Sequence, residues 1–227
     1  MSKKGGSRHI KGLVTPRYMD VGKKQYAYTI KPAPGRHSGD KSIALSLLLR
    51  KLGLAQTARE ARIAISSGSA KVNGKIVRDI RFPIGINDIV EVEKAGKSVA
   101  IGIDNVAHMA VRDVSKSDRL SQLFKVVGKH TAKGGLSLLR LHDGRLIKAS
   151  KDARVNDSVS LSEGEVDRVF KMAGGSKCLV VSGVHVGTSG SIVSITPGTM
   201  HVGAKALVKV KENEQFETLV KNIMVTG

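Results

Sequence analysis

Eight Lys and Arg residues are concentrated between positions 50 and 81, where only two carboxylates oppose them. The cations are Arg50, Lys51, Arg59, Arg62, Lys71, Lys75, Arg78 and Arg81, and the carboxylates are Glu60 and Asp79. Guanidinium and ammonium groups bind phosphate oxygens, and such contacts position a protein on nucleic acid without reading its bases. A solvated helix face explains one or two charges, but this density favours a surface for the phosphates of a folded RNA.

The first third of the chain carries most of the net charge. Residues 1–81 contain 18 Lys and Arg against 4 Asp and Glu, whereas residues 82–227 contain 20 against 15. The whole chain of 227 residues has a formal net charge of +19. Because like charges repel one another, this asymmetry predicts a polyanionic partner, and nucleic acid is favoured over an acidic membrane surface.

Cysteine and histidine give no sign of a metal or redox site. The single cysteine, Cys178, lies in the apolar run 178–181, which indicates a buried structural thiol. No two of the seven His residues have the spacing of metal ligands on one helix or loop. We therefore expect no metal and no cofactor. No apolar run is long enough for a membrane span, so we expect a cytoplasmic protein.

An RNA-modifying enzyme, such as a pseudouridine synthase with an RNA-binding handle, is the second hypothesis. It would need a nucleophilic Asp in a deep pocket. The aspartates of the second half lie in turns or polar stretches, where we expect them to be solvated: Asp113, Asp118, Asp143, Asp152 and Asp157. The Gly-rich segment 183–190 is followed by neither Lys-Ser nor a helical pattern, so it predicts a turn and not a nucleotide cradle. The sequence therefore favours a protein with no catalysis and no small-molecule substrate.

The cations at 50–81 need a small α+β unit to position them. Leu45, Leu48, Leu49 and Leu52 have the spacing of one buried helical face, and Gly53 ends that helix. Thr57-x-x-Glu60 is a capping box for a second helix that ends before Gly68. On this second helix Arg59 and Arg62 share an exposed side. Asn73-Gly74 then joins two short strands in a hairpin, and residues 88–93 form a further strand.

The rest of the chain predicts β modules on one side of this unit and a basic arm on the other. Residues 95–173 and 174–227 alternate short apolar runs with turn signals such as Asp143-Gly144, which is typical of a central β domain and a terminal barrel. Residues 1–41 hold ten Lys and Arg and all three tyrosines, and Pro16, Pro32 and Pro34 exclude one continuous helix. This arm is either a disordered tail or, as we expect, a segment outside the core that orders on RNA.

The segment 42–94 resembles the S4-type RNA-binding domain. The matching residues run from Leu49 to Ala55, from Thr57 to Arg62, and from Lys71 through Val72-Asn73-Gly74 to Lys75, with Gly68 between them. The domain commonly has an Arg directly after the capping residue. Here Ala58 stands in that place and Arg59 follows.

The resemblance extends over nearly the whole chain, to the small-subunit ribosomal protein four family of archaea and eukaryotes. It rests on 32–37 (PAPGRH), 124–129 (FKVVGK), 133–135 (KGG), 141–145 (LHDGR) and the segment 183–190, which looks like a KOW loop. The departures are Tyr18 where the family often has Trp, and Val184 where it usually has Gly. The resemblance implies a multidomain α+β and all-β fold: a basic arm (1–41), an S4-type domain (42–94), a central β domain (95–173) and a KOW, SH3-like barrel (174–227).

The resemblance also implies a structural constituent of the small ribosomal subunit that supports its assembly and translation. Its partners would be small-subunit rRNA and neighbouring ribosomal proteins, with one copy per subunit and no membrane. A KOW-containing transcription factor or RNA chaperone is a third hypothesis, but it leaves the arm and the central domain unexplained. The residues expected to bind RNA are Lys3, Lys4, Arg8, Lys11, Arg17, Lys23, Lys24, Arg36, Arg50, Lys51, Arg59, Arg62, Lys71, Asn73, Lys75, Arg78 and Arg81.

Overall fold

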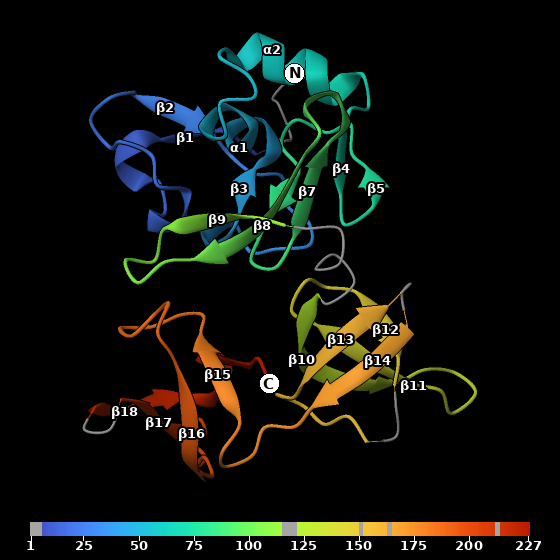
Figure 1. The fold of residues 1–227 in the computed structure, drawn as a ribbon, viewed down its shortest axis with the longest axis vertical. Coiled ribbons are helices and arrows are strands. Elements are labelled where there is room, and N and C mark those ends of the chain that lie inside the picture. Colours follow the sequence, from blue (N-terminus) through green and yellow to red (C-terminus); the bar gives the residue numbers. More distant parts are fainter. Residues whose placement is uncertain (1–5, 115–121, 150–151, 163–164, 212–213) are drawn as a thin grey trace. The chain divides into compact units, whose positions relative to one another are not determined.

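The computed structural model of the protein describes residues 6–114, 122–149, 152–162, 165–211 and 214–227. The chain forms two compact units (Figure 1). The first unit contains Met1–Gly102 and His108–Ser115, and the second contains Ile103–Ala107 and Lys116–Gly227. Over the described residues, the structure has two α-helices and several antiparallel sheets, as expected for a chain of α+β and all-β segments.

In the first unit, two α-helices pack beside a five-stranded sheet of order β5-β4-β7-β8-β9 (Figure 1). The helices are α1 (Leu45–Lys51) and α2 (Ala58–Ser66), and the strands are β4 (Ala70–Val72), β5 (Lys75–Ile76), β7 (Ile89–Val92), β8 (Lys97–Ile103) and β9 (Met109–Asp113). Further pairs join β1 (His9–Lys11) to β2 (Tyr28–Ile30) and β3 (Ile43–Ala44) to β6 (Pro83–Ile84). Short 3-10 turns lie at Gly12–Val14, Arg17–Met19, Gly39–Lys41 and Glu93–Ala95.

The helix signals of the sequence are confirmed. Leu45, Leu48 and Leu49 of α1 are buried, and Gly53 has the left-handed φ of +68° that ends a helix readily. The capping box is formed: Thr57 Oγ1 accepts from the Glu60 backbone N–H at 3.2 Å. The Asn73-Gly74 turn joins β4 to β5, with positive φ at both residues, as this type of hairpin requires.

Strand pairing extends the first unit beyond the boundary expected near residue 94. Strand β8 pairs with β7 in the register Val90↔Val99, and β9 lies beside β8 at the edge of the same sheet. Val99 and Ile101 are buried in that position. The alternating apolar residues of 97–103 are compatible with a strand in either neighbouring domain. Long-range backbone pairing with β7 is what assigns this strand to the first unit.

The arm also contributes to the core of the first unit, although the sequence predicts a segment outside it. Tyr18 and Met19 are 4% and 1% exposed, and burial raises the pKa of the Tyr18 hydroxyl. His37 is buried as well, and the Ala33 N–H donates to the Arg81 carbonyl. Buried side chains spaced along an otherwise basic segment therefore anchor it to the rest of the first unit.

The second unit is built from two five-stranded antiparallel sheets. The first has the order β12-β11-β10-β13-β14, from strands β10 (Leu123–Thr131), β11 (Ser137–Leu141), β12 (Leu146–Lys148), β13 (Ser158–Ser162) and β14 (Glu165–Phe170). The second has the order β18-β17-β16-β15-β19, from β15 (Lys177–Val180), β16 (Ser189–Thr196), β17 (Lys205–Lys211), β18 (Glu214–Leu219) and β19 (Ile223–Val225), with a 3-10 turn at Val220–Asn222. The Asp143-Gly144 hairpin turn is confirmed between β11 and β12.

Each sheet of the second unit has its own core. Phe124, Val126 and Leu139 are central to one core, and Cys178, Ile192 and Val208 to the other. Cys178 is 1% exposed, which confirms the buried thiol, and burial raises its pKa. The small number of aromatic side chains in the chain is consistent with these aliphatic cores.

Candidate nucleic-acid interface

The exposed face of α2 and the adjacent hairpin present cations to solvent. Arg59 and Arg62 are exposed on α2, and Lys75 and Arg78 are exposed at and after β5. Glu60 is the one carboxylate on α2, and it accepts hydrogen bonds from the backbone N–H of Gln56 at 2.8 Å and of Thr57 at 3.4 Å. These bonds, led by that from Gln56, lower the pKa of Glu60. The carboxylate is thus directed at the start of the helix, and not at the two arginines.

Lys51 and Lys71 each have a carboxylate partner. Lys51 Nζ lies 2.9 Å from Asp20 Oδ2, and Lys71 Nζ lies 2.5 Å from Glu93 Oε1. The hydrogen bond that the Lys71 ammonium donates to Glu93 raises the pKa of Lys71. Since these ammonium groups already have a counterion, a phosphate would have to compete with the carboxylate for them.

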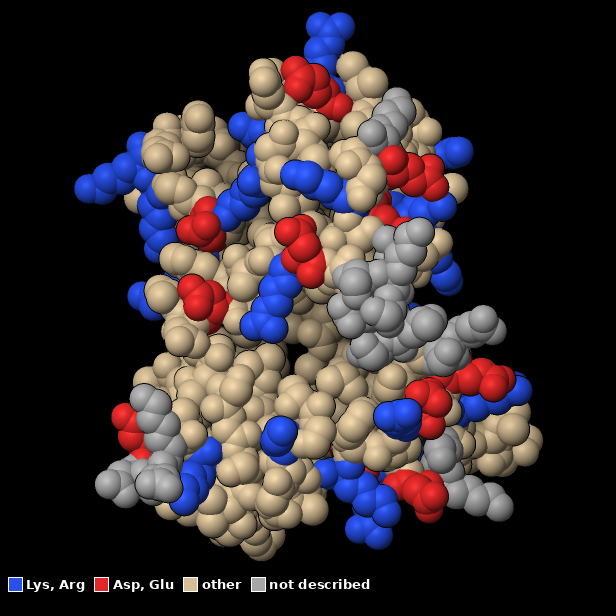
Figure 2. All heavy atoms as spheres, viewed as in Figure 1, with Lys and Arg blue, Asp and Glu red and all other residues tan. Residues whose placement is uncertain are grey.

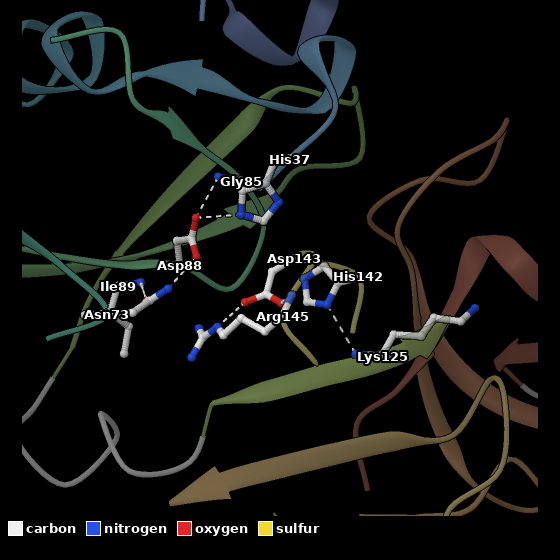
Figure 3. A network of polar contacts seen from close by, with 9 residues as sticks. All are labelled: His37, Asn73, Gly85, Asp88, Ile89, Lys125, His142, Asp143 and Arg145. Carbon is white, nitrogen blue, oxygen red and sulfur yellow. Dashed lines mark hydrogen bonds and ion pairs between the residues drawn. The ribbon is translucent and has the colours of Figure 1, made fainter. Parts of the chain in front are cut away.

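Asn73 holds the hairpin in place through a buried carboxylate (Figure 3). Its amide donates to Asp88 Oδ1 at 2.6 Å and accepts from the Ile89 N–H at 2.8 Å. The other oxygen of Asp88 lies 2.7 Å from His37 Nε2 and accepts from the Gly85 N–H at 3.0 Å. Burial favours the neutral form of Asp88, but these hydrogen bonds outweigh it, so the pKa of Asp88 is lowered.

The arm adds exposed cations to the same unit. Arg8, Lys11, Arg17, Lys23 and Lys24 are exposed. In Figure 2, Lys and Arg side chains project along the outline of the first unit. Of the remaining candidates, Arg50 is exposed and Arg36 and Arg81 are half-buried, whereas Lys3 and Lys4 lie outside the described residues.

The Gly-rich segment 183–190 connects β15 to β16 as a turn. Gly183 and Gly187 have φ values of +103° and +79°. Val184 at its tip is 92% exposed, and the His185 ring stacks on Phe216 with centroids 4.0 Å apart. β-Strand follows the segment, as the sequence predicts, and no helix opens there to receive a phosphate.

The expectation of solvated carboxylates is wrong for Asp143 and Asp157. Asp143 is 1% exposed and accepts from the Arg145 backbone N–H at 3.0 Å and from the Arg145 guanidinium (Figure 3). Asp157 is 4% exposed and accepts from the backbone N–H groups of Arg154 and Met172. Turn carboxylates often bind nearby backbone N–H groups, which explains why a polar stretch can place them inside. Asp118 lies outside the described residues.

Three family models match successive segments of the chain. The RS4NT (NUC023) domain matches residues 4–40, the S4 domain matches 45–90, and ribosomal family S4e matches 95–166. The small ribosomal subunit protein eS4 of Staphylothermus marinus is 30% identical over 239 residues, which cover 100% of this chain and 95% of the relative. The eS4 protein of Methanothermobacter thermautotrophicus is 31% identical over 223 residues, which cover 97% of this chain and 92% of the relative. The chain belongs to the eS4 family.

A solved structure supports the same assignment for the fold of this eS4 family member. The 30S ribosomal protein S4e from Thermoplasma acidophilum matches with a TM-score of 0.70 at 28% identity, over 83% of this chain and 96% of that chain. The eS4 family consists of structural ribosomal proteins and not of enzymes, which excludes the pseudouridine-synthase hypothesis. The family also locates the chain at the ribosome in the cytoplasm. Within the described parts of the chain, no helix is both long and apolar enough to cross a membrane.

Sequence reasoning missed the buried residues that hold this surface together. His37 and Asp88 are 51 positions apart, and neither follows a pattern that predicts the other. The only available signal was the resemblance itself, because His37 belongs to the segment 32–37 that carries it. The sequence singled out the tyrosines of the arm, but it did not predict that Tyr26 and Tyr28 line a hollow beside α1.

Proposed function

We propose that this eS4 family member is a structural constituent of the small ribosomal subunit that binds rRNA through its arm and its S4-type domain. Binding would support subunit assembly and translation without catalysis. The observation that carries the proposal is the exposed pair Arg59 and Arg62 on α2, together with the exposed Lys75 and Arg78 of the same unit, while the carboxylate of Glu60 is engaged by backbone N–H groups. Guanidinium groups presented from a rigid helix can contact adjacent phosphates of a folded RNA.

We further propose that the domains divide as arm, S4-type domain, central β domain and KOW-type, SH3-like barrel. The five-stranded antiparallel sheet of residues 177–225 and the Gly-rich connection between β15 and β16 support the barrel. The partners would be small-subunit rRNA and neighbouring ribosomal proteins, with one copy per subunit. The residues that would contact RNA are the exposed cations of the first unit, with smaller contributions from Lys51 and Lys71, which are paired with carboxylates.

The test measures the salt dependence of binding to a transcript of the small-subunit rRNA. The double variant Arg59→Gln/Arg62→Gln should bind more weakly, and its slope of log affinity against log salt should flatten by up to about one unit for each lost phosphate contact. The matched control is Arg140→Gln/Arg168→Gln, which removes the same charge from exposed positions in the central segment. Equal slopes for the two double variants would show that α2 does not contact phosphate.

A second measurement tests the assembly. In sucrose gradients of lysate, the tagged full-length chain should sediment with the small subunit and remain there after a moderate salt wash. Recovery only in the free fraction would contradict a structural role in the subunit.

A further inference from the structure

The arm and the helices of the first unit line an open hollow of about 480 Å³. Its volume lies in the range of about 300–1,000 Å³ that is usual for small-ligand sites. One wall comes from the arm and includes His9, Tyr26 and Tyr28, and the other comes from α1 and the first residue of α2, including Leu47 and Ala58. A second hollow of about 590 Å³ lies against the arm, and Tyr26 and Tyr28 line it as well. The two tyrosines therefore separate two adjacent hollows.

The Tyr28 ring and the backbone around both tyrosines are held in place, and both rings remain accessible. Strand β2 pairs with β1 so that Tyr28 lies opposite Lys11, and the Tyr28 ring meets the His9 ring edge-on with centroids 4.9 Å apart. Beyond β1, the Gly12 N–H donates to the Ala27 carbonyl at 2.9 Å, and a Cβ atom at Gly12 would overlap the Tyr26 carbonyl oxygen. Despite these constraints, Tyr26 is 63% exposed and Tyr28 is 56% exposed. Exposed aromatic rings on a fixed backbone are suited to stacking with a ligand.

The charges around both hollows are of one sign. Arg8 and Arg50 line the first hollow, and Lys11, Lys23 and Lys24 line the second. Among the described residues, neither lining includes an Asp or Glu. A ligand that fits must therefore combine a flat apolar part with negative charge on either side of it. An unpaired nucleotide within an RNA strand has this composition, since its base stacks on aromatic rings while the flanking phosphates pair with cations.

We propose that Tyr26 and Tyr28 form a binding site for an unstacked nucleotide of rRNA, with the base in the hollow between the arm and α1. The base stacks on the tyrosine rings, Arg8 and Arg50 contact the phosphate on one side, and the Lys11, Lys23 and Lys24 ammonium groups contact the strand on the other side. The small side chain of Ala58 leaves the hollow open at the start of α2. This site rests on the proposed function, because it assumes that the first unit binds rRNA, and it adds recognition of an unpaired nucleotide to phosphate contacts that any RNA helix offers.

The test compares Tyr26→Leu/Tyr28→Leu with Tyr26→Phe/Tyr28→Phe in the full-length chain. Loss of one stacked base should lower the affinity for the small-subunit rRNA transcript on the order of 5- to 100-fold in the Leu variant. The salt slope should stay that of the unaltered chain, because no charge is removed. The Phe variant keeps the rings and should bind within about twofold of the unaltered chain. An independent variant, Ala58→Leu, fills the hollow from an exposed position and should lower the affinity in the same way, again with an unchanged salt slope.

The outcomes separate this site from the proposed function. If the unaltered chain shows no salt-dependent binding to the transcript, both proposals fail. If it binds and the Leu variant binds equally well, rRNA binding stands and the nucleotide site is overturned. A transcript carrying 4-thiouridine should crosslink to the peptide that contains Tyr26 and Tyr28, at a nucleotide that chemical probing shows to be unpaired. Crosslinking of this peptide at base-paired nucleotides only, or to a neighbouring protein in assembled subunits, would also overturn the site.

Discussion

A buried anion joins distant segments in the first unit, and a buried cation does so in the second unit. Asp88, 1% exposed, binds His37 of the arm and Asn73 of the β4–β5 hairpin (Figure 3). Lys125 on β10, 8% exposed, donates from Nζ to the carbonyl oxygens of Val220 at 2.7 Å and of Ile223 at 2.6 Å. Both groups satisfy the rule that a buried charge needs several hydrogen-bond partners.

Asp88 and Lys125 differ in their effect on the number of cations that remain exposed at the surface. The first unit has cations in excess and uses one of its few carboxylates to fix the arm and hairpin that carry them. The second unit has a smaller excess of cations, with 17 Lys and Arg against 11 Asp and Glu. It uses a lysine to join β10 to the turn before β19, with a further bond of 3.0 Å from the Val225 N–H to Ser158 Oγ. A count of positive charges therefore overstates the cations available to RNA in the second unit, because Lys125 serves the fold.

The largest effect should come from Asp88→Ala. Removal of the carboxylate leaves the His37 ring, the Asn73 amide and the Gly85 N–H without their acceptor, and loss of a buried charged partner costs about 3–5 kcal/mol. Amide hydrogen exchange by mass spectrometry should show lost protection in β7 and in residues 33–37. The control Asp40→Ala removes an exposed carboxylate of the same unit and should change protection little. Equal loss in both variants would show that the buried network contributes nothing specific.

Lys125→Met should have the next largest effect. Methionine keeps the apolar length of the side chain but leaves two buried carbonyl oxygens unpaired, and a hydrogen bond to a charged group contributes about 1.5–3 kcal/mol. Exchange protection should fall at residues 220–225 and stay unchanged in β7. Lys129→Met is the matched control, because Lys129 is exposed on the same strand. If Lys129→Met lowers the exchange protection of residues 220–225 as much as Lys125→Met does, the buried position of the Lys125 ammonium group does not stabilise this segment.

Gly85→Ala should destabilise the first unit by a smaller amount. An added Cβ atom at residue 85 would overlap the His37 ring, and overpacking of a core costs about 1–3 kcal/mol. Gly39→Ala places a methyl group in open space and should be neutral by comparison. Thermal unfolding of the two variants measures the difference. A stability of Gly85→Ala equal to that of Gly39→Ala would mean that His37 moves aside without loss.

The smallest effect should be the pH dependence that Asp88 gives to the first unit. Because the pKa of Asp88 is lowered on folding, its stabilising contribution is complete above the unfolded value of about 3.9 and is lost as the pH falls from there toward the folded value. Protection of β7, corrected for intrinsic exchange, should decline in this acid range. The decline should be weaker in Asp88→Asn, which does not titrate. An identical decline in both proteins would assign the acid sensitivity to other groups.

Local signals predicted the elements, while the links between them could not be predicted. Thr57 and Glu60 are three residues apart, and Asn73 and Gly74 are adjacent, so the physics that fixes the cap and the turn is contained in the sequence around them. Asp88 and His37, or Lys125 and Val220, are brought together only by the completed fold. The exposed cations were predictable from composition, but the paired state of Lys51 depends on Asp20, which a linear charge count places in the arm.

Cys178 is a natural probe of local opening in the second unit. It is the only cysteine of the chain, it is 1% exposed, and it pairs with Gly190 of β16 on one side and with Val225 of β19 on the other. Burial also raises the pKa of its thiol, so alkylation in the folded state should be slow on both counts. The rate at which an alkylating reagent modifies the native protein therefore reports how often the strands around Cys178 open, without any engineered label.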